Sequence, residues 1–98
     1  MRELDVRGEI CPYPMMRTVE LLRQINGEDL MVITDHPPAL TTIPWEAAKL
    51  GYEADLQRVE GRAEWRILLR KTDRQRSQQE IMAELAQKVR AAQAGGGA

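Results

Sequence analysis

The sequence predicts an α+β two-layer sandwich of order β-α-β-α-β-β, with an extra helix at its C-terminal end. Three observations lead to this prediction. The 98 residues, 43% of them apolar, suffice for one small core but not for two. Apolar residues alternate with strand-like and helix-like spacing along the first seventy positions. Glycines and prolines punctuate these segments, so we expect two helices on one face of a four-stranded mixed sheet.

The first strand and the first helix come from the N-terminal quarter of the chain. Leu4 to Val6 alternates as a short strand, and Gly8 gives the backbone freedom for the following turn. Pro12 to Ile25 has the period of an amphipathic helix, which Asn26-Gly27 stops. Its predicted buried stripe consists of Met15, Met16, Val19, Leu22 and Ile25.

A buried strand and a second helix follow. Leu30 to Thr34 is a compact run rich in β-branched residues, typical of a buried strand. Asp35 to Pro38 breaks it, and a helix is predicted from about Ala39 to Leu50. Pro44 either opens the main part of this helix or kinks it.

The last two strands form an antiparallel hairpin. The pattern predicts strands from Tyr52 to Val59 and from Glu64 to Arg70, with a turn at residues 60–62 between them. We expect Trp45 and Trp65 in the core. The first two strands, joined through a helix, should lie parallel.

Residues 1–72 form the predicted domain, and residues 73–98 form a separate C-terminal segment. Ser77 and Glu80 have the spacing of a capping box, and apolar residues then recur at helical intervals. Residues 91–98 end in three glycines and one alanine and are predicted to be disordered. The helix either packs on its own domain or contacts a second copy or another partner.

Composition excludes several functions. Fourteen basic and fifteen acidic residues argue against direct nucleic-acid binding. No apolar run is long enough to span a membrane, and the N-terminus lacks a secretory signal, so we expect a cytoplasmic protein. One cysteine and one histidine build neither a disulfide nor a zinc site, and we expect no metal and no cofactor.

The chemistry centres on Cys11-Pro12-Tyr13-Pro14, where the first helix begins. With Cys11 as N-cap, Pro12 occupies N1 and Pro14 occupies N3, positions that need no amide donor. The amides of Tyr13 and Met15, together with the helix dipole, would favour a thiolate at Cys11. A lone cysteine is more commonly an inert core residue. Two prolines in one turn favour the functional interpretation, because no helix needs both merely to begin.

Four other side chains are candidate neighbours of the thiol. The loops after two parallel strands lie at the same end of a sheet, so His36 and Asp35 could approach Cys11. A histidine beside two prolines is more often a solvated turn residue, and without a third orienting group a hydrolase triad fits poorly. Asp35 could instead cap the turn that follows it. For Arg7 and Arg17 two interpretations stay open: each is an ordinary solvated arginine, or each attracts an anionic partner to the thiol.

The chain resembles the TusA-type sulfur-carrier family, also called SirA-like. Leu4 to Gly8, followed two residues later by the Cys-Pro-x-Pro motif, resembles the family signature. The similarity covers about residues 3 to 71 and includes Asp35-His36-Pro37 and Ile43-Pro44. The Cys-Pro-x-Pro motif is specific in this position, and the other matches are individually weak but fall in the right order.

This resemblance implies that Cys11 accepts sulfane sulfur as a persulfide from a cysteine desulfurase or a rhodanese-like donor. The family passes the sulfur to an acceptor protein in tRNA thiolation, molybdenum-cofactor metabolism or sulfur oxidation. Gly8, Pro12, Tyr13 and Pro14 would support the motif, and Tyr13 is a candidate partner contact. The sequence departs from the family at His36 and Thr42, where acidic residues are common, which puts the identity of the partner in doubt.

Two rival functions keep the same fold. One is an accessory protein that processes thiosulfate for a membrane importer, which retains Cys11 but changes the sulfur donor. The other is a regulatory binding module without covalent chemistry, which would use the C-terminal helix and would tolerate Cys11→Ser.

Overall fold

The structure is a computed structural model that describes residues 2–10, 12–25, 27–59, 61, 63–73 and 77–95. Its elements are β1 (Arg2–Asp5), α1 (Tyr13–Gln24), β2 (Leu30–Thr34), α2 (Ala39–Lys49), β3 (Tyr52–Arg58), β4 (Trp65–Lys71) and α3 (Gln78–Gly95). The predicted order and fold class are confirmed. The largest boundary error within the sandwich is at β1, which starts two residues earlier than predicted.

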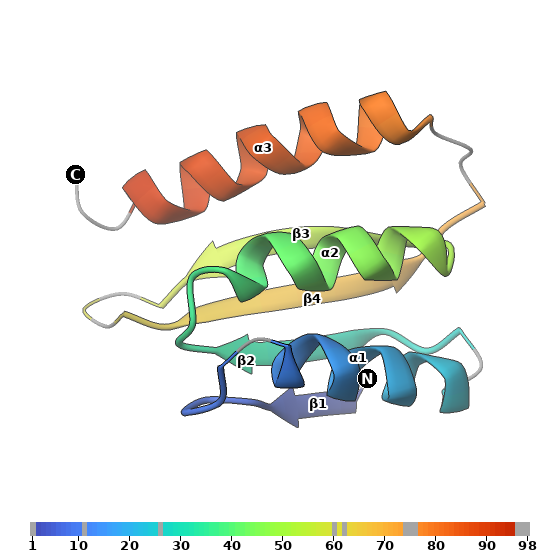
Figure 1. The fold of residues 1–98 in the computed structure, drawn as a ribbon, viewed down its shortest axis with the longest axis horizontal. Coiled ribbons are helices and arrows are strands. Elements are labelled where there is room, and N and C mark those ends of the chain that lie inside the picture. Colours follow the sequence, from blue (N-terminus) through green and yellow to red (C-terminus); the bar gives the residue numbers. More distant parts are fainter. Residues whose placement is uncertain are drawn as a thin grey trace.

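The four strands form one sheet in the order β1-β2-β4-β3 (Figure 1). The pairing of β1 with β2 is parallel, as predicted, and the other two pairings are antiparallel. Asp5 is in register with Ile33, and Thr34 is in register with Trp65. The ends of β1 and β2 therefore meet the start of β4, which brings three loops together at one end of the sheet.

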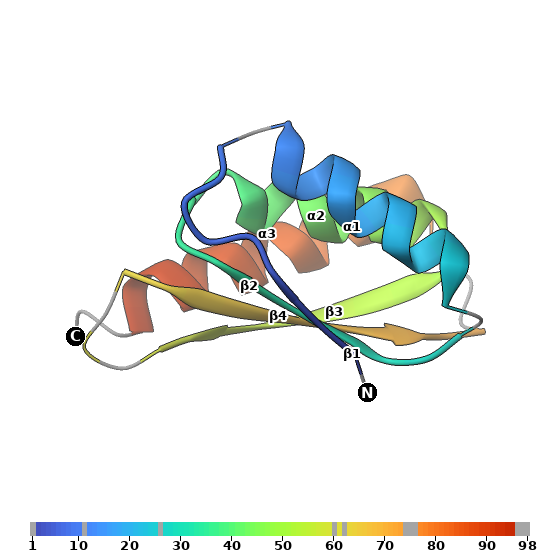
Figure 2. The same cartoon turned by 90° about the horizontal axis from the view of Figure 1, so that it is seen from below.

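The helices lie on one face of the sheet (Figure 2). The side chains of Leu30, Val32, Ile67 and Leu69 are completely buried beneath them. Their neighbours along the strands turn to the other face, where Leu68 is half-buried and Arg66 is exposed. The alternation in β2 and β4 thus fixes which face of the sheet carries the core.

The buried face of α1 matches the predicted stripe only in part, since Leu22 and Ile25 are buried as predicted. Pro14, Thr18 and Leu22 are its buried residues, spaced four apart, and the Thr18 hydroxyl donates to the Pro14 carbonyl at 2.8 Å. Met16 was predicted to be buried but is 54% exposed. Because Pro14 occupies the core side of the first turn, Met16, two residues later on the helical wheel, is turned toward solvent.

Helix α2 contains Pro44 in its interior. Because α2 begins at Ala39, five residues before it, Pro44 lies within the helix and does not open it. The proline is buried together with Leu40, Ile43 and Ala47. Trp65 is a core residue, as predicted, with 5% of its surface exposed. Trp45 is only half-buried, because it lies on the side of α2 where the Lys49 ammonium sits 5.6 Å from the centre of its ring. The prediction of a core position for Trp45 is therefore wrong.

Helix α3 packs on its own domain, against α2 and edge strand β3 (Figure 1). Leu85 and Ala92 are buried, and the Trp65 indole donates to the Ala92 carbonyl at 3.3 Å. The predicted cap is present, since the Glu80 amide donates to the Ser77 hydroxyl at 3.2 Å. The helix continues through Gly95, so the prediction of disorder from residue 91 is wrong up to that point, and residues 96–98 lie outside the described part. Among the described helices, none is both long and apolar enough to cross a membrane.

Candidate functional site

The sequence places the candidate site at the start of α1, in the loop that follows β1. Cys11 itself lies outside the described residues, whereas the residues on either side of it are described. Helix α1 begins at Tyr13, and Pro12 occupies the N-cap. The predicted cap positions, with Cys11 as N-cap and Pro12 at N1, are therefore wrong by one residue. Pro14 consequently stands at N2 and not at N3.

The first turn of α1 is held by its backbone and by Pro14. No side chain among the described residues caps this turn, and it contains no acidic residue. The Tyr13 amide donates to the Ile10 carbonyl at 3.0 Å, so it is not the free donor that we predicted. Pro14 is buried while Pro12 and Tyr13 are exposed. The turn is thus anchored in the core on one side and open to solvent on the other.

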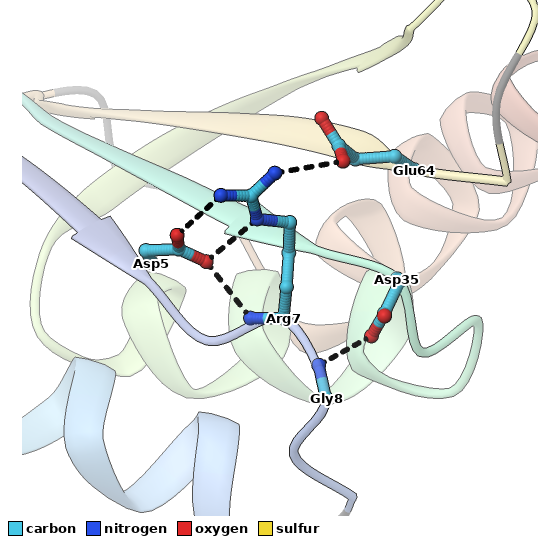
Figure 3. A network of polar contacts seen from close by, with 5 residues as sticks. All are labelled: Asp5, Arg7, Gly8, Asp35 and Glu64. Atoms are coloured by element: carbon cyan, nitrogen blue, oxygen red, sulfur yellow. Dashed lines mark hydrogen bonds and ion pairs between the residues drawn. The ribbon is translucent and has the colours of Figure 1, made fainter.

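An ion-pair network fixes the chain directly after β1 (Figure 3). The Arg7 guanidinium donates to both carboxylate oxygens of Asp5, at 2.9 and 2.7 Å, and to a carboxylate oxygen of Glu64 at 3.2 Å. The Arg7 amide also donates to Asp5, at 3.0 Å. Arg7 thereby ties the end of β1 to the segment that enters β4. The Arg7 guanidinium forms two hydrogen bonds to the Asp5 carboxylate and a third to the Glu64 carboxylate.

These contacts shift the acid–base properties of the pair. The side-chain hydrogen bonds from Arg7, followed by its backbone hydrogen bond, lower the pKa of Asp5 to about 2. The hydrogen bonds to Asp5 and then to Glu64 raise the pKa of Arg7 above its ordinary value. The side chain of Glu64 is largely buried, with 13% exposed, whereas those of Arg7 and Asp5 are about half exposed. Asp5 and Arg7 are therefore both charged at neutral pH.

A second contact joins the loops after β1 and β2. The Gly8 amide donates to a carboxylate oxygen of Asp35 at 2.9 Å (Figure 3). Asp35 thus binds the loop that leads to Cys11, whereas we predicted that it caps its own following turn. Gly8 has a φ of +83°, in the left-handed region that other residues rarely adopt. This backbone conformation requires glycine at the position where Asp35 holds the chain.

The remaining predicted neighbours have partners of their own. The His36 amide donates to the Thr34 hydroxyl at 3.1 Å, its carbonyl accepts from the Ala39 amide at 3.0 Å, and its side chain is half-buried. Arg17 forms an ion pair of 3.0 Å with Glu9. Of the predicted site residues, Gly8 and Asp35 contact each other, whereas Arg7 contacts Asp5 and Glu64. The approach of His36 to the Cys11 thiol stays a prediction.

Sequence reasoning missed three residues of this region. Glu64 lies 57 positions from its partner Arg7, and only the strand order shows that they meet. Ile10 and Met16 are 62% and 54% exposed, which their apolar character did not indicate. Only the closeness of Ile10 and Met16 to the Cys-Pro-x-Pro motif in the sequence could have indicated that they belong to this region.

The arrangement is a rigid platform for a side chain at position 11. Arg7 and Asp35 hold the loop before it, and the buried Pro14 anchors the helix after it. Among the described residues, no group of three or more His, Cys, Asp or Glu side chains is placed to hold a metal ion. The described residues therefore fix the chain on both sides of position 11 and leave the start of α1 without a side-chain cap.

Comparisons with known proteins give the family. Residues 2–71 match the family model described as sulfurtransferase TusA. A protein of Methanocaldococcus jannaschii named "putative sulfur carrier protein" is 40% identical over 72 residues, which cover 72% of this chain and 95% of that protein. A protein of the same description from Archaeoglobus fulgidus is 39% identical over 69 residues, covering 69% and 78%. YedF of Escherichia coli is 44% identical over 50 residues, covering 50% of this chain and 65% of YedF.

A solved structure supports the fold. The SirA-like protein of Desulfitobacterium hafniense superposes with a TM-score of 0.66 at 19% identity, covering 71% of this chain and 96% of that one. The family match covers residues 2–71 and so ends at the last residue of β4, before α3 begins. The chain belongs to the TusA sulfurtransferase family.

Proposed function

We propose that this protein is a sulfur carrier that holds sulfane sulfur on Cys11 as a persulfide. It accepts the sulfur from a donor protein and passes it to the cysteine of an acceptor, in the reducing environment of the cytoplasm. The observation that carries the proposal is the family match, which includes Cys11 within residues 2–71. The relatives at about 40% identity are named putative sulfur carrier proteins, and a carrier needs a sulfur donor and a sulfur acceptor.

The chemistry is two successive thiolate attacks. The Cys11 thiolate attacks the outer sulfur of the donor's persulfide, a new S–S bond forms, and the donor cysteine leaves as a thiolate. The acceptor's thiolate then attacks the outer sulfur on Cys11, which leaves as a thiolate in turn. Each step exchanges one S–S bond for another, so no external oxidant or reductant is consumed.

The start of α1 suits this chemistry. A helix N-terminus favours an anion, and here the first turn carries neither a side-chain cap nor an acidic residue among the described residues. The stabilisation of a thiolate at such a position is typically about 0.3–1 kcal/mol. The network around Arg7 and Asp35 supports the role in a second way, because a carrier sulfur that meets two partners in turn benefits from a fixed presentation.

Intact-mass spectrometry tests the proposal. The protein is incubated with a cysteine desulfurase and cysteine, and we expect a gain of one sulfur atom that a reducing thiol removes. Since Cys11 is the only cysteine, Cys11→Ser should show no such gain. Circular dichroism checks that the variant is folded. An unchanged mass with cysteine desulfurases and rhodanese-type donors, or an equal gain in Cys11→Ser, contradicts the proposal.

A further inference from the structure

Helix α3 carries a second apolar row beside the one that packs on the domain. The inward row recurs at spacings of four and three, and it consists of Ile81, Leu85, Lys88 and Ala92. A row shifted by one residue has the same spacing and consists of Met82, Ala86 and Val89. Met82 is 49% exposed, Ala86 is exposed and Val89 is half-buried. We call these three residues the Met82–Ala86–Val89 row.

This row forms one wall of a groove between α3 and α2. The groove is lined by one residue of α2 and five of α3, namely Thr41, Met82, Leu85, Ala86, Val89 and Arg90. Helix α3 lies at the outer side of the helix layer, and α2 lies between it and α1 (Figure 1). The groove is therefore on a different side of the molecule from the start of α1. An apolar centre with charged residues at its margin is the composition of a protein interface.

The charges of α3 are divided between its two halves. Both acidic residues of the helix, Glu80 and Glu84, precede Ala86, and both basic residues, Lys88 and Arg90, follow it. Lys88 forms an ion pair of 3.7 Å with Asp55 of its own domain. Glu80 and Arg90 are exposed. One end of the row is thus acidic at the surface, and the other end is basic.

Such a surface is complementary to a second copy of itself. In an antiparallel pair of α3 helices centred on Ala86, the acidic half of each helix lies against the basic half of the other, and Met82 of each copy meets Val89 of the other. The small side chain of Ala86 lets the two helices approach closely at the centre. A parallel pair would place like charges side by side, and a partner of one charge sign would match only half of the helix.

We infer that the Met82–Ala86–Val89 row is the interface of a symmetric homodimer, in which the α3 helices of two copies pack antiparallel beside Thr41. The two-fold axis passes through Ala86, so the same surface serves both copies and the assembly is closed. The inference is independent of the proposed function, since α3 lies outside the family match. Because α2 lies between α3 and α1, the α1 helices remain outside the interface, and one dimer presents two copies of the candidate site.

Sedimentation equilibrium of the full chain tests the interface. Under reducing conditions, which prevent disulfides through Cys11, we expect a reversible monomer–dimer equilibrium in the micromolar range, since a surface from one helix and the margin of another is small for a specific interface. Ala86→Glu places two like charges on the axis and should raise the dissociation constant at least about ten-fold. Gln87→Glu adds the same charge at an exposed position off the row and is the matched control. Circular dichroism checks that both variants are folded.

Single cysteines in a Cys11→Ser background test the orientation. Ala86→Cys brings the two Cα atoms at the axis within the ~7 Å that a disulfide requires, so oxidised glutathione should link two chains through it. Glu80→Cys is six residues from the axis, which separates it from its own copy by about 18 Å in an antiparallel pair, so it should form no linked dimer. In a parallel pair the two Glu80→Cys thiols would lie side by side.

Each result supports or overturns the inference. A chain that stays monomeric at every concentration overturns the interface, and so does an equal effect of Ala86→Glu and Gln87→Glu. Cross-linking through Glu80→Cys but not through Ala86→Cys overturns the antiparallel arrangement. Neither measurement uses a sulfur donor, so a failure of the carrier function leaves this interface standing, and a monomeric protein leaves the carrier function standing.

Discussion

The starts of α1 and α3 are held in opposite ways. Helix α3 begins with its own cap, in which Ser77 accepts from the Glu80 amide. Helix α1 begins behind Pro12 with no side-chain cap among the described residues, and its loop is held by Arg7 and Asp35. A helix that caps itself leaves its end occupied. In α1 the Tyr13 amide is taken by the Ile10 carbonyl, but no side chain among the described residues caps the helix start, which leaves that position open to a reactive side chain at position 11.

The first prediction sharpens the contrast by weakening α3 through its packing. Leu85 is 5% exposed in the layer between α3, α2 and β3. Leu85→Ala should lower the free energy of unfolding by about 2–4 kcal/mol, from lost burial and a residual cavity. At temperatures where the variant remains folded, sulfur loading of Cys11 should be unchanged, because α3 does not hold the start of α1.

Urea unfolding measures the stability, and intact mass measures loading of the same samples. Met82→Ala on the same helix serves as the control and should change stability by less than about 0.5 kcal/mol, since its side chain is half exposed. A loss of loading in folded Leu85→Ala would show that the two helix starts are not independent.

The second prediction tests whether α1 depends on the loops around it. Asp35→Ala removes the acceptor of the Gly8 amide, a contact worth about 1 kcal/mol at an exposed position. Amide hydrogen exchange at Gly8 and its neighbours should therefore accelerate about five-fold, while α3 remains unaffected. Asp73→Ala, at another exposed acid, is the control. If the Gly8 amide exchanges at the same rate in Asp35→Ala and Asp73→Ala, Asp35 does not stabilise the loop before position 11.

The fold was predictable because its signals are local. The run of five residues in β2 was predicted with the boundaries that the structure has, and Ser77 with Glu80 located the start of α3. The predicted parallel pairing of β1 with β2 followed from the helix between them. Each of these inferences needs only neighbouring residues and the geometry of one connection.

The candidate site was predictable in part. The Cys-Pro-x-Pro motif located it, but the contact between Arg7 and Glu64 depends on β4 lying beside β2, which no local pattern encodes. The exposure of Met16 depends on Pro14 taking the buried position two residues before it. Hydrophobicity alone indicates which residues are able to enter a core, and the competition for space decides which of them do.

The third prediction removes the cap of α3. Ser77→Ala should lower the stability of the protein by about 1 kcal/mol, because the Glu80 amide loses its acceptor. Urea unfolding monitored by circular dichroism measures the effect. Ser77→Asp keeps an acceptor at the same place and should retain the wild-type stability. If Ser77→Ala is as stable as the wild type, packing alone holds α3. The side-chain cap that distinguishes the start of α3 from that of α1 would then contribute nothing to stability.

The smallest effect concerns the ion pair that anchors the loop before α1. The pKa of Asp5 is lowered from 3.8 to about 2, so its contribution to stability is complete above about pH 4 and is lost as the pH falls through 2. Asp5→Asn lacks this titration, and its stability should therefore fall less steeply than that of the wild type between pH 4 and pH 2. The difference should be small and should shrink in high salt, since the Asp5 and Arg7 side chains are about half exposed. Urea midpoints for both proteins across this pH range measure it. Parallel curves would mean that Arg7 holds the loop through Glu64 and not through Asp5.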